Sequence, residues 1–174
     1  MRAGKVRWVG CSNLSARELV EAQATARRHT LAGFVSCQDE YGLLVRDVER
    51  ELVPTAKSLG MGLLPYFPLA SGLLTGKYER NARLPPGSRL GKNPRHAQRF
   101  ASERNWRIID ELAAFAARRD HTLLKLAFSW LLRDSVVASL IAGATTEQQV
   151  EQNARAAGWT LSAEDLAEID RITL

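Results

Sequence analysis

Four short apolar runs recur along the chain, and each is followed by a stretch with helical periodicity. The runs cover residues 6–11, 34–38, 61–66 and 136–141. Runs of this length are typical of strands that are covered on both faces in a parallel sheet. Parallel strands joined through helices cross over in the right-handed sense. The alternation therefore predicts an α/β protein with a parallel sheet.

The helices between these runs have start and stop signals. Ser15 and Glu18 have the spacing of a capping box, which predicts a helix to about residue 29. A second helix is expected over residues 47–59, where Gly60 ends it and Pro54 predicts a kink or a late start. Further helices are expected over residues 103–119, 123–132 and 147–157, and Ser162 caps a last one.

Two architectures satisfy this pattern: a doubly wound open sheet and a (β/α) barrel. No G-x-G-x-x-G follows the first run, so the dinucleotide fingerprint of the doubly wound type is absent. The runs end in polar or special residues, at positions 12–13, 38–40, 66 and 143–146. In a barrel these ends meet at one rim, where barrel enzymes build their sites. Because a full barrel takes eight units and about 250 residues, this chain is predicted to be a TIM-type half barrel of about four βα units.

The net charge of +5 comes from one segment. Residues 77–99 hold seven Lys or Arg and one acid, Glu79, whereas the other residues carry 17 basic and 18 acidic groups. Proline and glycine residues predict a basic loop over residues 76–100. This loop is either a solvated segment or one that folds over a phosphate-bearing ligand. No nucleic acid partner is expected, because only Tyr78 and Phe100 could stack on bases.

Several other classes of protein are disfavoured. Cys11 and Cys37 cannot form a disulfide framework, and the three histidines have no metal-ligand spacing, so no metal is expected. No apolar run approaches the roughly 18 residues of a membrane-spanning helix, and no signal peptide opens the chain. We therefore expect a cytoplasmic protein without a membrane partner.

A family resemblance rests on four segments in order. They are V-R-W-V-G-C-S-N at 6–13, Q-D-E-Y at 38–41, Y-F-P-L-A-S-G-L-L-T-G-K-Y at 66–78 and G-A-T-T-E-Q-Q at 143–149. Together with residues 87–90 and 161–166 they resemble the aldo-keto reductase family. The resemblance implies that residues 1–174 are the C-terminal half of the family's (β/α)8 barrel, from its fifth strand onward. It also implies an NAD(P)H-dependent oxidoreductase that transfers hydride between nicotinamide and a carbonyl or alcohol.

The resemblance implies a cofactor site of ten residues. Three of them match positions on the nicotinamide carboxamide, one matches the aromatic that stacks under the ring, three belong to the pyrophosphate loop, and three surround the adenosine end. In that order they are Ser12, Asn13 and Gln38; Tyr66; Leu69, Ser71 and Lys77; and Thr145, Gln149 and Asn153. Amide side chains can both donate to and accept from a carboxamide, which agrees with the first assignment.

Simpler roles exist for single residues of this set. Ser12 and Asn13 alone would be a helix-capping pair, and Tyr66 alone would be a half-buried core aromatic. Asp39 and Glu40 are consecutive strand residues that point to opposite faces, so we interpret them as structural and not as an acid and base pair. We interpret Cys11 as an unreactive thiol.

Two departures from the family pattern concern the cofactor and the catalytic groups. Gly143 and Gln149 stand where many NADP-specific members have Lys and Arg, so these positions do not select NADPH over NADH unless Arg89 or another loop cation substitutes. The resemblance implies NADP as the cofactor, with NAD as the alternative. The family's catalytic Asp, Tyr, Lys and His lie in its N-terminal half. No catalytic residue is therefore expected in this chain, and neither Tyr66 nor His29 takes that role.

Assembly follows from the predicted half barrel. Its two strand edges are unpaired, and an inner face with Val9, Val35 and Leu64 is expected to be uncovered, which predicts self-association or a complementing N-terminal half. Residues 1–7 resemble the end of a family helix, as in a truncated or split reductase. Two main functional hypotheses follow: a reductase for a small carbonyl substrate once completed, and a nucleotide-binding or assembly module without chemistry.

Overall fold

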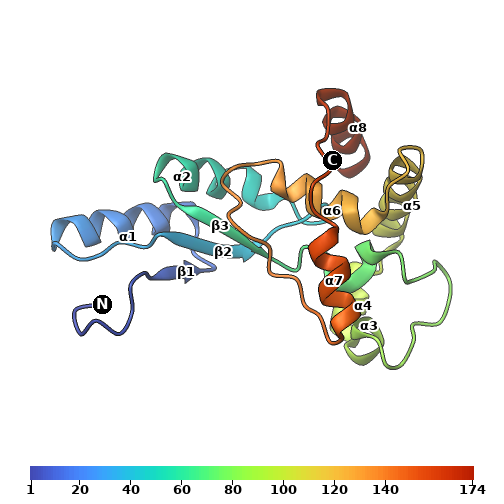
Figure 1. Ribbon diagram of the computed structural model, residues 1–174, viewed down its shortest axis with the longest axis horizontal. Coiled ribbons are helices and arrows are strands. Elements are labelled where there is room, and N and C mark those ends of the chain that lie inside the picture. The colour runs from blue at the N-terminus through green and yellow to red at the C-terminus, as the bar shows by residue number, and fades with distance from the viewer.

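The computed structural model describes residues 1–174 and contains a three-stranded parallel sheet with helical crossovers (Figure 1). The strands are β1 (Gly10–Ser12), β2 (Ser36–Glu40) and β3 (Gly62–Tyr66), in the order β1-β2-β3. The crossovers contain helix α1 (Ala16–Arg28), and then the 3-10 turn η1 (Asp47–Glu49) with helix α2 (Leu52–Ser58). The α/β class and the parallel sheet are confirmed.

The remaining helices gather at the far end of the molecule from the N-terminus (Figure 1). They are η2 (Ala70–Thr75), α3 (Arg89–Lys92), α4 (Pro94–Phe100), α5 (Glu103–Ala117), α6 (Leu123–Leu132), α7 (Glu147–Arg155) and α8 (Ala163–Thr173). Helix α6 is the central one and buries most of its residues, including Leu126 and Trp130. None of the helices combines the length and the apolar character needed to cross a membrane.

The fourth apolar run lies beside β3 in parallel orientation but does not form a regular strand. The Leu63 N–H donates to the Val136 backbone oxygen at 2.7 Å, and the Leu63 backbone oxygen accepts from the Ala138 N–H at 3.0 Å. The Ile141 N–H then donates to the Pro65 oxygen at 2.9 Å, so one extra residue is inserted on this side. Pro65 has no N–H to donate, which interrupts the ladder at this point. The expected strand is therefore corrected to two isolated bridges.

Most of the expected helix boundaries agree with the structure. Ser15 and Ser162 both form capping boxes, and Gly60 follows α2 with a φ of +65°. The second helix is shorter than expected, because η1 is separate and α2 begins only at Leu52, with Pro54 in its first turn. The late start that Pro54 predicts is thus confirmed.

Two expectations about irregular segments are wrong. The basic segment 76–100 is not all loop, because the Ser88 and Asn93 side chains cap the short helices α3 and α4 within it. Each cap accepts a hydrogen bond from a backbone N–H of the first turn. Such a cap stabilises a short helix even in a segment that is rich in proline and glycine. Residues 1–9 form turns and no helix, so they do not continue a helix into β1.

The uncovered face of the sheet is more polar than expected. Cys37 and Leu63 are in-register neighbours on the buried face of the sheet. Val9 and Val35 lie two residues before Cys11 and Cys37, so they point to this same face and not to the face of Leu64. The opposite face, called the open face below, consists of Gly10, Ser12, Ser36, Gln38, Glu40, Gly62, Leu64 and Tyr66. The expectation of an apolar inner face is therefore wrong for this half of the sheet.

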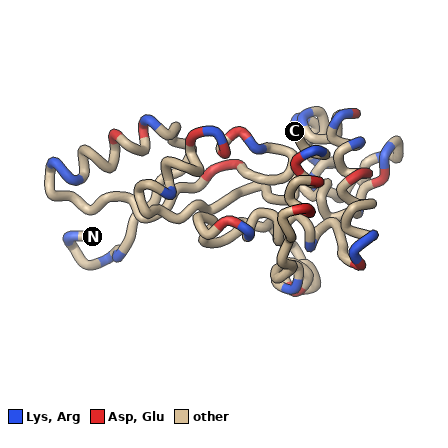
Figure 2. The backbone as a smooth tube through the Cα atoms, turned by 90° about the horizontal axis from the view of Figure 1, so that it is seen from above, with Lys and Arg blue, Asp and Glu red and all other residues tan.

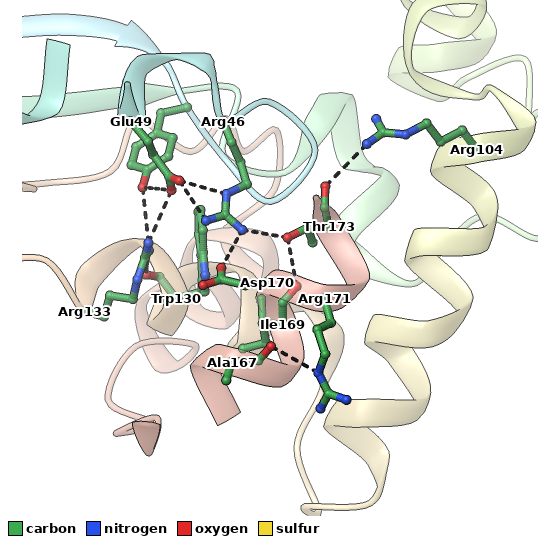
Figure 3. A network of polar contacts seen from close by, with 11 residues as sticks. Arg46, Glu49, Arg104, Trp130, Arg133, Ala167, Ile169, Asp170, Arg171 and Thr173 are labelled. Carbon is green, nitrogen blue, oxygen red and sulfur yellow. Dashed lines mark hydrogen bonds and ion pairs between the residues drawn. The ribbon is translucent and has the colours of Figure 1, made fainter. Parts of the chain in front are cut away.

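Helix α8 is tied to the rest of the chain by ion pairs. Arg119, just after α5, bonds to Asp165 at 2.7 Å, and Arg46, ahead of η1, bonds to Asp170 at 2.7 Å (Figure 3). Figure 2 shows acidic and basic residues interspersed around this end of the chain. These ion pairs add to the packing of Leu166, Ile169 and Ile172 against the core.

Candidate functional site

The carboxyl ends of the three strands bring three of the ten predicted site residues together with Glu40. The register pairs Ser12 with Gln38 across β1 and β2, and it pairs Glu40 with Tyr66 across β2 and β3. In-register residues of parallel strands point to the same face of the sheet. Ser12, Gln38, Glu40 and Tyr66 therefore share one end of the open face.

A chain of hydrogen bonds connects the ends of β1 and β3. The Tyr66 hydroxyl donates to Asn13 Oδ1 at 2.8 Å, and Asn13 Nδ2 donates to Ser12 Oγ at 2.9 Å. Ser12 Oγ in turn donates to the Gln38 backbone oxygen at 3.0 Å. Asn13 has a φ of +58°, a left-handed conformation that asparagine tolerates and that turns its side chain toward Tyr66.

Asn13 and Gln38 keep polar atoms that are free to bind a ligand. Asn13 keeps one amide hydrogen and one oxygen lone pair, and the Gln38 side chain has no partner within the chain. The Tyr66 ring is half-buried, with Phe67 against it edge-on at 5.4 Å between centroids. Burial raises the pKa of Tyr66, and the negative charges of Asp39 and Glu40 raise it further, so its hydroxyl is a donor near neutral pH.

The segment after β3 has an unusual backbone. Phe67, Ala70, Ser71, Gly72 and Gly76 all have positive φ values, between +46° and +96°. Such conformations are strained for residues other than glycine and are most often found where a function requires them. Successive backbone N–H groups in left-handed turns can form a concave site for anions.

The three predicted residues of this segment are in different environments. Leu69 and Ser71 are buried, with 8% and 4% of their surfaces exposed, and Ser71 Oγ lies 3.0 Å from His96 Nδ1 on α4. Their side chains therefore stabilise the loop, and only their backbone can face a ligand. Lys77 is exposed, with its ammonium 5.1 Å from the centre of the Tyr78 ring.

Helices α3 and α4 cover this segment with cationic and aromatic side chains. The Arg89 guanidinium lies 4.9 Å from the centre of the Phe67 ring, and the His96 ring packs edge-on against Phe67 at 5.4 Å. Arg99 forms an ion pair with Glu40 at 2.9 Å, which ties α4 to the end of β2. Our sequence reasoning did not assign a site role to Phe67, His96, Glu40 or Arg99. Each of these residues contacts a partner that is remote in sequence. The only sequence signal for a role here was the basic charge of residues 76–100.

The three remaining predicted residues lie on and before α7. The Thr145 N–H and hydroxyl both bond to Gln149 Oε1, at 2.7 and 3.2 Å, so these two side chains are paired with each other. Asn153 is half-buried on the same helix. A side chain at Gly143 would lie 3.4 Å from the Arg89 guanidinium, so the segment before α7 meets the basic helix α3. Gly143 thus lies beside Arg89, although the sequence separates them by more than 50 residues.

The other titratable groups near the strand ends do not form a catalytic arrangement. Asp39 Oδ1 accepts the Glu40 N–H at 2.8 Å, while burial raises the Asp39 pKa. Burial likewise raises the pKa of Cys11, which agrees with an unreactive thiol. No three His, Cys, Asp or Glu side chains lie close enough together to hold a metal ion.

Two hollows of about 690 and 470 Å³ lie elsewhere, one beside the end of α6 and one beside α1. Neither is lined by any of the ten predicted residues, so neither hollow is the predicted site. We base the site on the converging side chains, because a sheet open at one side cannot enclose a cavity there.

Comparison with known proteins identifies one family. It matches the Aldo/keto reductase family over residues 1–173. It is 33% identical over 173 residues to the uncharacterized oxidoreductase YrpG of Bacillus subtilis, covering 99% of this chain and 50% of that protein. It is 32% identical over 177 residues to L-glyceraldehyde 3-phosphate reductase of Escherichia coli, covering 98% and 50%. A probable voltage-gated potassium channel subunit beta of Oryza sativa is 37% identical over 150 residues, covering 84% and 45%.

The chain spans about half the length of the curated relatives that it matches. The family match, in contrast, covers nearly every residue from one end to the other. The chain therefore belongs to the aldo/keto reductase family.

Proposed function

We propose that this chain is the nicotinamide-nucleotide-binding half of an aldo-keto reductase and corresponds to the C-terminal half of its barrel. Three parallel strands and a fourth bridged run lie side by side, as four βα units of a TIM-type barrel would. The half-length coverage of relatives supports the same interpretation. The proposed domain is residues 1–174, with the basic segment 76–100 next to the nucleotide.

The observation that carries this proposal is the group made by Asn13, Gln38 and Tyr66. The donor set fits a nicotinamide: Asn13 and Gln38 offer both amide donors and acceptors, and Tyr66 offers a partly exposed aromatic face that is fixed through its hydroxyl. Stacking on a flat ring typically contributes about 0.5–1.5 kcal/mol beyond burial. We propose NADP as the cofactor, with NAD as the alternative.

The phosphates of the nucleotide would lie along the left-handed segment and the basic helices. Lys77 is exposed there, and the backbone N–H groups of Leu69 and Ser71 belong to the same turn. Thr145, Gln149 and Asn153 are proposed at the adenosine end. Thr145 and Gln149 would exchange their mutual bond for bonds to the nucleotide.

The cofactor supplies hydride chemistry when it is bound, but reduction of a carbonyl also needs a proton donor at the developing alkoxide. Such a positioned acid commonly contributes about 10² to 10⁴-fold. Tyr66 already donates to Asn13 and its ring is assigned to stacking, and no other acid lies at the open end of the face except Glu40, which is paired with Arg99. We therefore assign no catalytic residue to this chain and propose a small carbonyl compound as the substrate only when a complementing half supplies the donor.

The open strand edges support the proposed assembly. The outer edges of β1 and of the fourth run carry backbone groups without strand partners. Large apolar side chains are exposed near the β1 edge, including Trp8 at 69% and Val35 at 42%. We propose that the chain self-associates or pairs with an N-terminal half. Light scattering that finds a cooperative, folded monomer at low micromolar concentration would contradict both.

Titration calorimetry with NADPH and NADH tests the nucleotide site. We expect dissociation constants nearer the millimolar than the micromolar range, because the missing half does not cover the ring. Tyr66→Ala and Lys77→Ala should each weaken binding, whereas Lys5→Ala, which removes the same charge from the exposed N-terminal segment, should not. Unchanged binding in both site variants would place the nucleotide elsewhere.

A second measurement separates the reductase from a non-catalytic nucleotide-binding module. The chain alone should not oxidise NADPH with a reactive aldehyde such as nitrobenzaldehyde, and a co-expressed N-terminal half from a relative should restore turnover. Saturable turnover by the chain alone would show that it contains a proton donor. Nucleotide binding without restored turnover would favour the non-catalytic nucleotide-binding module. The observation that supports this alternative is that no free acid lies at the site.

A further inference from the structure

Glu40 lies on the open face beside Tyr66, and Arg99 neutralises its charge only in part. It is the in-register neighbour of Tyr66 and lies two residues beyond Gln38 on the same face. Its side chain is 14% exposed. One carboxylate oxygen, Oε2, meets Arg99 at 2.9 Å, while the other, Oε1, is buried without any hydrogen-bond partner.

A buried carboxylate oxygen without a partner is costly, and it calls for an explanation at a binding site. Arg99 itself is 51% exposed, so solvent weakens its compensation of Glu40. Asp39 lies behind Glu40 on the opposite face and adds a second negative charge. Both carboxylates raise the pKa of Tyr66 beyond the effect of burial, and Arg99 acts in the opposite direction. The charges that act on the Tyr66 hydroxyl are therefore two carboxylates and one guanidinium.

The charge of a nicotinamide ring depends on its redox state. The oxidised ring is a cation, and the transfer of a hydride, which carries two electrons and one proton, makes it neutral. A fixed negative potential beside the ring therefore stabilises the oxidised form more than the reduced form. Departure of hydride from the reduced ring toward a carbonyl becomes correspondingly more favourable.

We propose that Glu40, with Asp39 behind it, biases the nucleotide on Tyr66 toward its oxidised, cationic form, and that Arg99 limits this bias. The inference rests on the proposed nucleotide site and extends it. Glu40 is here a residue that sets the redox preference of the site, and it takes no proton in the reaction.

The test compares the dissociation constants of NADP⁺ and NADPH by calorimetry on the full chain. Glu40→Gln keeps the shape and removes the charge, and it should weaken NADP⁺ relative to NADPH by about three- to tenfold, because one charge acts through a partly solvated medium. Arg99→Gln leaves Glu40 uncompensated and should shift the ratio in the opposite direction. Asp39→Asn should shift the ratio in the same direction as Glu40→Gln, and Glu111→Gln on the exposed face of α5 should leave the ratio unchanged.

Opposite shifts in Glu40→Gln and Arg99→Gln would support the proposal, because a loss of structure changes both nucleotides in the same sense. Equal changes for NADP⁺ and NADPH in both variants would overturn it while leaving the nucleotide site intact. Failure of the unmodified chain to bind either nucleotide would overturn the proposed function itself. Should Glu40→Gln not fold, Arg99→Gln still decides, since a ratio unchanged in that variant contradicts the bias.

Discussion

Replacement of Arg46 tests how the C-terminal helix is held. Arg46 bonds through Nε and Nη2 to Glu49, and through Nη1 to Asp170 and Thr173 at 2.7 Å each (Figure 3). Its guanidinium also lies 4.9 Å from the centre of the Trp130 ring. These contacts join the segment after β2 to a helix more than 120 residues away in sequence. Arg46→Met keeps the apolar stem and removes every polar contact.

The exposure of the partners sets the size of the effect. The Arg46 side chain is only 10% exposed, whereas Glu49 and Asp170 are 26% and 46% exposed. Breaking a fully buried pair costs about 3–5 kcal/mol, and an exposed pair contributes about 0–1 kcal/mol. Solvent reaches Asp170, and Glu49 keeps a contact with Arg133 at 3.3 Å, so the loss should fall between these limits. We expect Arg46→Met to lower the free energy of unfolding by about 2–4 kcal/mol, and the melting temperature by about 5–15 °C.

Urea unfolding at fixed protein concentration measures the global effect, and hydrogen exchange localises it. The α8 amides should exchange faster in Arg46→Met, because the guanidinium ties Asp170 and Thr173 of this helix to the segment after β2. Arg155→Met is the matched control: Arg155 is 81% exposed in a pair with Glu151, so its loss should cost less than about 0.5 kcal/mol. A loss below about 1 kcal/mol for Arg46→Met, with unchanged α8 exchange, would refute the reasoning.

Three further outcomes follow from local contacts. Gln23→Ala should lower the free energy of unfolding in urea by about 2–4 kcal/mol, because the Gln23 amide bonds to both the N–H and the oxygen of Phe34 and its removal leaves two backbone groups without a partner. A decrease below about 1 kcal/mol would contradict this. Ser15→Ala and Ser162→Ala should each cost about 1 kcal/mol, since each removes the N-cap of a helix, and calorimetric melting would show it; no change in either would argue against the caps. Burial raises the pKa of Cys37 to about 11, so its thiol stays protonated at pH 8, and its alkylation should be slow there and accelerate only as the pH approaches 11; rapid labelling at pH 8 would be inconsistent with that burial.

The positions of elements were predictable wherever local signals decided them. The capping boxes at Ser15 and Ser162 and the apolar helix α6 depend on residues within one or two turns of each other, and the structure has them where expected. Segments with competing signals were predicted less well. Prolines and glycines in residues 76–100 indicated a loop, but the Ser88 and Asn93 caps produce α3 and α4. Pro65 interrupts the pairing of a run whose own sequence is a good strand.

The candidate site divides in the same way. The polar residue types at the strand ends could be read in order from the sequence, because parallel strands bring their carboxyl ends to one edge. The sequence could not show that Tyr66 donates to Asn13, that Ser71 is buried against His96, or that Arg99 neutralises one oxygen of Glu40.

By itself, the sequence determined the α/β alternation, most of the helix starts and the family, because these depend on periodicity, capping and ordered motifs. Only the tertiary structure decided which residues share the open face and which charges meet there. Ser12, Gln38 and Tyr66 are separated by more than 20 residues each, and their contact depends on strand register and on a left-handed turn at Asn13. Register is fixed by the packing of the buried face against the helices, a many-residue property that no local pattern contains.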